Sequence, residues 1–195
     1  MIYKWCTPDT IKEREVGCYD RQYSPDEFLL YDIKFLDTLE FSPVPRVDFI
    51  IPQKRVLAFD CLTNNAGIPL VNHKTKALLE KLAGHEVQFF VAEIVCTDGI
   101  LNDTYFYMNA LNGIRGIDYE KSVFTSEPSS NPDAIRHFRR SVYKDNALEG
   151  IHIAREIKYA STLLVDEVIK NAFDEAKIRG VKFIQPEDYN WCVAW

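Results

Sequence analysis

Two segments of this 195-residue chain share one pattern, which constrains the fold more than any other feature of the sequence. Each segment begins with a short apolar run, passes through a polar N-cap residue into an amphipathic stretch and a glycine, and ends in another apolar run. Residues 70–93 and 164–187 align with six identities. The pattern predicts an α+β protein with two principal helices and a mixed or mainly antiparallel sheet. An internal duplication and a chance likeness between two capped helices both explain the match.

The first helix is predicted to begin after Asn72, a good N-cap residue, and to end at Gly84. Its apolar positions recur at helical spacing: Ala77, Leu78 and Leu82. Strands are expected at Val87–Cys96 and Thr104–Leu111, because Asp98-Gly99 between them is a common hairpin turn signal.

The second helix is predicted to begin after Asp166 and to run to about Lys177, with Gly180 closing it. Its apolar face consists of Val168, Ile169, Ala172, Phe173 and Ala176. Further strands are expected at Ile135–Tyr143, Ile151–Ile157 and Val181–Ile184.

Chain length and composition favour one compact domain. Hydrophobic residues make up 47% of the chain and charged residues 27%, which is typical of a folded globule. The loop Ser126–Pro132 is rich in serine and proline, so an alternative is two closely packed lobes, about 1–125 and 133–195. The polar stretch Thr7–Glu27 is expected to be a long loop.

The net charge of −6 disfavours binding to nucleic acids and anionic membranes and favours basic protein partners. Solubility alone is an equally good reason for this acidity. No apolar run has membrane-spanning length and the N-terminus does not read as a signal peptide, so a cytoplasmic protein is expected. The cysteines are odd in number and lack a Cys-x-x-Cys pair, which favours reduced, buried thiols: Cys6, Cys18, Cys61, Cys96 and Cys192.

No sequence pattern indicates catalysis, a cofactor or a metal. A Gly-x-Ser-x-Gly elbow is absent, and the histidines lack metal-ligand spacing: His73, His85, His137 and His152. The basic stretch Arg136–Arg140 could grip an acidic partner. Strand alternation would divide its side chains between two faces, so a structural role is expected.

Three further motifs accompany the two helices. An aromatic strand runs from Tyr105 to Leu111, the signature Asp118-x-Glu120-Lys121-Ser122 follows it, and the second helix is followed by Arg179–Phe183. Together with the first helix and its strand, these motifs resemble a bacterial immunity-protein family from polymorphic toxin systems. The family tends to have serine where this chain has Asp166, which keeps the capping chemistry but departs from the family pattern.

The resemblance implies an α+β protein encoded beside a toxin, which protects the producing cell by tight binding and needs no cofactor or catalytic residue. The residue types of the signature suggest a structural role, because Asp118 and Ser122 can bond turn backbone and Lys121 can pair with an acid.

Toxin contacts are expected on variable loops, chiefly Thr7–Glu27 and Ser126–Pro132. The predicted contact residues are Tyr19, Asp20, Tyr23, Asp26 and Glu27. Acidic and aromatic side chains of this kind suit a basic toxin, bound by a monomer or a homodimer.

Two other functions stay open. One is an enzyme whose site is assembled from Asp118, Lys121 and His152, for which a deep pocket with perturbed pKa values would be diagnostic. The other is a homo-oligomeric structural or regulatory protein whose Trp191 and Trp195 cross a subunit interface.

Overall fold

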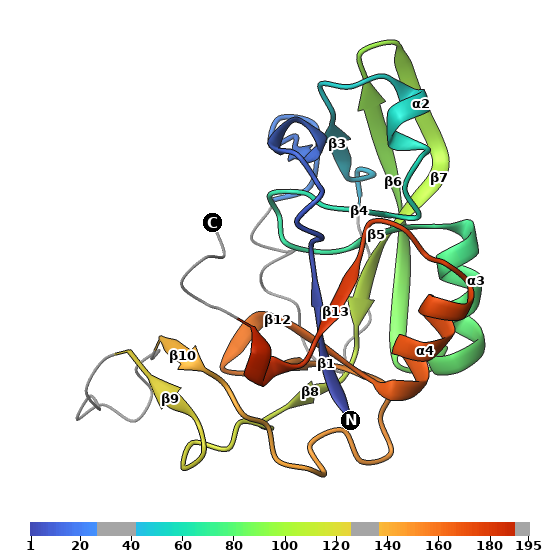
Figure 1. Cartoon of the computed structure of the whole chain (residues 1–195). Coiled ribbons are helices and arrows are strands. Elements are labelled where there is room, and N and C mark those ends of the chain that lie inside the picture. The colour runs from blue at the N-terminus through green and yellow to red at the C-terminus, as the bar shows by residue number, and fades with distance from the viewer. Residues whose placement is uncertain (27–41, 126–136, 190–195) are drawn as a thin grey trace.

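The computed structural model describes residues 1–26, 42–125 and 137–189. Its strands form two main sheets and a short ribbon, with the two longer helices on one side of the molecule (Figure 1). The predicted α+β class with mixed and antiparallel sheets is confirmed. The predicted boundary loop 126–132 and the tail residues Trp191 and Trp195 lie outside the described residues.

The larger sheet has the strand order β2-β3-β6-β7-β5-β4. Its strands are β2 (Cys18–Tyr19), β3 (Arg46–Asp48), β4 (Cys61–Leu62), β5 (Leu70–Asn72), β6 (Val87–Cys96) and β7 (Gly99–Ala110). The pair β3–β6 is parallel and the other pairs are antiparallel. The hairpin predicted at Asp98-Gly99 joins β6 to β7, but β7 begins five residues earlier than the expected strand.

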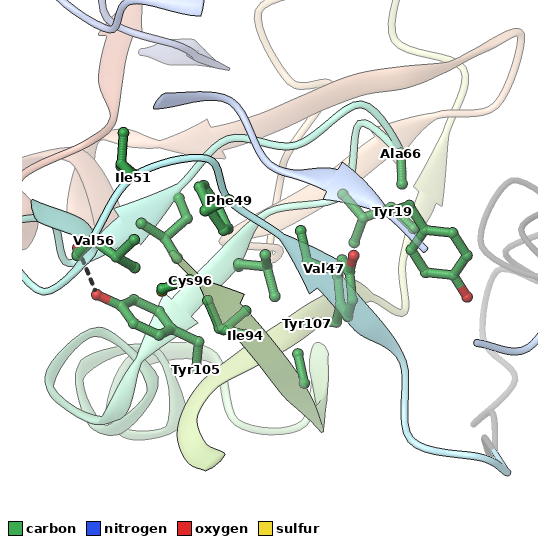
Figure 2. Close-up of a cluster of buried hydrophobic side chains, with 14 residues drawn as sticks. Tyr19, Val47, Phe49, Ile51, Val56, Ala66, Ile94, Cys96, Tyr105 and Tyr107 are labelled. Carbon is green, nitrogen blue, oxygen red and sulfur yellow. Dashed lines mark hydrogen bonds between the residues drawn. The ribbon is translucent and has the colours of Figure 1, made fainter. Parts of the chain in front are cut away.

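One face of the larger sheet carries a hydrophobic cluster (Figure 2). The short helix α2 (Gln53–Val56) and the following loop cover this face, and the hydroxyl of Tyr105 donates to the backbone oxygens of Val56 and Phe59 at 3.0 and 2.7 Å. The cluster includes Tyr19, Val47, Phe49, Ile51, Ile94, Cys96 and Tyr107.

The smaller sheet has the strand order β13-β1-β12-β11-β8. Its strands are β1 (Ile2–Cys6), β8 (Gly113–Ile114), β11 (Ile153–Glu156), β12 (Tyr159–Asp166) and β13 (Lys182–Ile184). The ribbon pairs β9 (Val123–Phe124) with β10 (Phe138–Arg140). Two 3-10 turns complete the described elements: η1 (Glu13–Glu15) and η2 (Pro186–Asp188). The N-terminal strand thus lies among C-terminal strands, so the two sheets do not separate at the middle of the chain.

Helices α3 (His73–Ala83) and α4 (Glu167–Glu175) begin where predicted. The side chain of Asn72 accepts from the backbone N–H of Thr75, and that of Asp166 from Ile169, both at 3.0 Å. The two helices pack together in a second core cluster that joins the two sheets. In α3 the fully buried positions are Thr75, Leu79 and Ala83, so the expected apolar face is rotated and Ala77 is exposed.

The two helix segments have the same topology. Strands β5 and β6 flank β7, and β12 and β13 flank β1, with the central strand antiparallel to both neighbours in each case. The paired residues are Val71 with Phe106 and Phe89 with Met108 in the first unit, and Val165 with Tyr3 and Phe183 with Trp5 in the second. The 94-residue offset therefore holds in the strand register, which is what an internal duplication predicts.

Candidate functional site

The middle of the predicted contact loop, at Gly17–Tyr19, is tied to the body of the larger sheet. The backbone N–H of Gly17 donates a hydrogen bond to Thr63 O, and Gly17 O accepts one from the N–H of Asn65. The side-chain oxygen of Asn65 in turn accepts from the N–H of Tyr19 at 2.8 Å. Tyr19 is 2% exposed, and its hydroxyl donates to the backbone oxygen of Pro25 at 2.7 Å. Tyr19 therefore belongs to the core, where its burial stops it from presenting its ring to a partner; it serves to hold the loop in place.

Asp20 shapes the exposed turn that follows. One of its carboxylate oxygens accepts from the backbone N–H of Gln22 at 2.8 Å and of Tyr23 at 3.3 Å, which is an Asx-type turn. The turn leaves Tyr23 57% exposed. Asp26 is also exposed, whereas Glu27 lies outside the described residues.

The turn packs against an ion cluster centred on Arg46 of β3. Nε of Arg46 lies 3.1 Å from Asp48, 3.3 Å from Asp20 and 3.9 Å from Glu93, and the guanidinium carbon lies 5.3 Å from the ring centre of Tyr23. The hydrogen bond to Asp48 and the surrounding carboxylates raise the pKa of Arg46. Three acids surround one base, so the cluster carries a net negative charge.

The sequence prediction of contact residues included Asp20 and Tyr23, which adjoin this cluster, but not Arg46, Asp48 or Glu93. The parallel pairing of β3 with β6 places Arg46 opposite Glu93 and Asp48 opposite Val95. The one sequence signal for these residues was strand alternation in β3, which places Arg46 and Asp48 together on the face opposite the buried Val47.

The family signature forms a closed turn elsewhere on the molecule. Asp118 accepts from the backbone N–H groups of Glu120 and Lys121 at 3.1 Å, and its carboxylate lies 3.4 Å from the Lys121 ammonium. These hydrogen bonds lower the pKa of Asp118. The hydroxyl of Ser122 donates to the Asp118 backbone oxygen at 2.6 Å and accepts from the N–H of Val142 at 3.0 Å. All of these contacts stabilise the turn.

The residues of the alternative enzyme have separate partners. Nδ1 of His152 lies 2.7 Å from the carboxylate of Asp166, the N-cap of α4, whereas Asp118 and Lys121 pair with each other. A cavity of about 1490 Å³ lies beside β1 and β13, and within the part of the chain described here none of these three residues lines it.

The cavity wall contains Lys4 and Cys6 of β1. Burial lowers the pKa of Lys4 to about 8 and raises that of Cys6 to about 11. The Lys4 ammonium lies 3.5 Å from the ring centre of Tyr189, so the C-terminal end of the described chain packs on it. Burial is the first cause of both shifts and accounts for them without an acid–base pair.

The basic stretch departs from the expected alternation. The register between β9 and β10 shifts between Phe138 and Arg140, so Phe138 is buried while Arg139 and Arg140 are both exposed. The prediction that the strand divides the arginines between two faces is therefore wrong for this pair, because a bulge adds a residue to one strand. Arg136 lies outside the described residues.

Residues 1–26, 42–125 and 137–189 also bear on metal binding, membrane insertion and cysteine chemistry. This portion holds no group of three or more His, Cys, Asp or Glu side chains placed to bind a metal ion. It also contains no helix long and apolar enough to cross a membrane. Cys6, Cys61 and Cys96 are buried free thiols, whereas Cys18 is exposed, which differs from the expectation of buried cysteines.

Comparison with family models and with curated proteins gives different results. No curated protein matches the chain. The model of the Imm11 immunity protein family matches residues 7–188, which include helices α3 and α4, the larger sheet, the Arg46 cluster and every strand of the smaller sheet except β1. The chain therefore belongs to the Imm11 immunity protein family.

Proposed function

We propose that this chain neutralises a bacterial toxin by binding to it in the cytoplasm of the producing cell. The family match over residues 7–188 is the observation that carries this proposal. The contacts of the three candidate catalytic residues support binding over catalysis. Asp118 pairs with Lys121 within a turn, and His152 contacts Asp166, the N-cap of α4, so each contact has a structural role.

The proposed contacts include Asp20, Tyr23 and Asp26 on the exposed turn. An exposed tyrosine beside carboxylates suits a basic toxin, because charge accelerates association while a buried aromatic ring supplies affinity. The second predicted loop, Ser126–Pro132, stays a proposal on sequence grounds alone.

Co-expression tests the function directly. The product of each gene that neighbours the gene of this chain would be expressed with and without the chain, and growth of the host would be measured. We expect one product to arrest growth, the chain to restore growth, and the purified pair to elute together in size-exclusion chromatography. Neither rescue nor capture of any neighbouring product would contradict the proposal.

A further inference from the structure

Helix α3 covers only part of one face of the larger sheet. The covered part lies around Phe89 and Phe106, whose rings are each 5.4 Å from the Lys76 ammonium of the helix. The helix begins at His73, whose Nε2 lies 2.6 Å from the backbone oxygen of Asp103. Beyond this point the end of the β6–β7 hairpin extends past the helix (Figure 1).

Strand register shows which side chains lie on the uncovered part. Ile94 and Leu101 are paired and pack into the hydrophobic cluster, so the next pair, Val95 and Ile100, points to the opposite face. Asp48 is the β3 neighbour of Val95 and shares this face. The chain continues beside β6 after β3, and Phe49 and Ile51 pack into the cluster, so Ile50 between them points to the opposite face. We define the uncovered face as the part of this face that α3 does not cover, consisting of Arg46, Asp48, Ile50, Glu93, Val95 and Ile100.

The uncovered face combines exposed aliphatic side chains with the Arg46 cluster. Ile50 is 74% exposed and Ile100 is 48% exposed, although both are large aliphatic residues beside a well-packed sheet. Three carboxylates, those of Asp20, Asp48 and Glu93, lie within 4 Å of the single Arg46 guanidinium group. Protein interfaces combine an apolar centre with charged residues that complement the partner. An apolar strip beside a net negative cluster therefore suits a positively charged partner.

We propose that the uncovered face is the surface on which the toxin docks, through an apolar strip of the toxin flanked by lysine or arginine side chains. The inference rests on the proposed function and extends its contact set from the turn at Asp20–Tyr23 to the sheet itself. Arg46 joins the two parts, because its side chain contacts both the turn and β6.

The test substitutes one residue that the proposed complex would bury and one equally exposed residue outside the docking surface. Ile100→Lys places a cation where the partner is basic, and Val168→Lys is the control because Val168 on α4 is 46% exposed. Binding of the toxin captured by the wild-type chain would be measured by surface plasmon resonance, and thermal melts would establish that both variants fold. We expect Ile100→Lys to weaken binding at least ~10-fold and Val168→Lys to change it less than ~2-fold.

Charge provides a second readout. Glu93→Gln is expected to lower the association rate constant ~3-fold at low salt and by less at high salt, because salt screens the charge. The control is Glu149→Gln at an exposed site on another part of the chain, and it should leave the association rate constant unchanged. Full binding by Ile100→Lys would overturn the docking surface while the proposed function stands.

A wild-type dimer that Ile100→Lys converts to a monomer, seen by light scattering, would assign the face to a second copy of the chain and overturn the toxin assignment. Failure of the wild-type chain to capture or neutralise any neighbouring product would overturn the proposed function and the docking surface together.

Discussion

Gly180 joins the second helix unit to the larger sheet through a contact that only glycine permits. Its φ is +94°, and a Cβ atom at this position would lie 1.9 Å from the backbone oxygen of Cys61. Around it the backbone N–H groups of Asp60 and Cys61 both donate to Arg179 O at 2.9 Å, and the N–H of Arg179 donates to the Asp60 carboxylate at 2.8 Å. Gly180→Ala therefore adds backbone strain and displaces three hydrogen bonds.

The expected loss follows from these contacts. Left-handed backbone costs a non-glycine residue about 1 kcal/mol, and three hydrogen bonds at about 1 kcal/mol each bring the total to about 4 kcal/mol. The free energy of unfolding would be measured by urea denaturation with far-UV circular dichroism. A loss of this size is a large part of the stability of an ordinary domain, so the midpoint should fall clearly.

Gly150 supplies the control for strain alone. Its φ is +75°, and a Cβ atom there would have no heavy atom within 4 Å. Gly150→Ala should therefore cost only about 1 kcal/mol. Equal losses for the two variants would refute the argument that close approach to Cys61 makes Gly180 necessary.

Three further changes test other contacts. Glu86→Ala should cost about 3 kcal/mol in the same urea assay, because one oxygen of the buried Glu86 carboxylate accepts from the backbone N–H groups of His152 and Ile153 at 2.8 Å. Glu86→Gln keeps an acceptor and should cost less than half as much. Lys177→Gly should raise the midpoint, with a gain of about 1 kcal/mol, because Lys177 follows Ala176, the C-cap of α4, and has a φ of +53°. No gain would contradict the strain argument. Burial lowers the pKa of Lys4 to about 8, so the folded state loses that proton before the unfolded state does. Stability of the wild type relative to Lys4→Met should consequently rise between pH 8 and pH 10.5 by up to about 3 kcal/mol, and a flat difference would show that Lys4 titrates normally.

Features controlled by near neighbours in the chain were predictable. The N-caps Asn72 and Asp166 each bond a backbone N–H three residues ahead, and Asp98-Gly99 forms the hairpin turn between two strands. Such contacts depend on a few adjacent residues, so sequence spacing reveals them. The likeness of the two helix units also appeared in the sequence, although their common register appeared only in the structure.

Features that depend on distant partners were not predictable. Tyr19 was expected on the surface because its neighbours are polar, yet Asn65 and Pro25 hold it in the core. The exposure of both Arg139 and Arg140 depends on a bulge against β9, and strand alternation alone gives the opposite result for this pair.

The sequence by itself determined the α+β class, the two capped helices and the likeness to an immunity-protein family, because hydrophobic period, caps and motifs are local properties. Tertiary structure decided which side chains meet. Asp20, Arg46 and Glu93 come from separate parts of the chain. The antiparallel pairing of β2 with β3 and the parallel pairing of β3 with β6 bring both acids within 4 Å of Arg46. Pairing over such separations depends on how the whole core is buried, so the uncovered face emerges only when both sheets and α3 are in place.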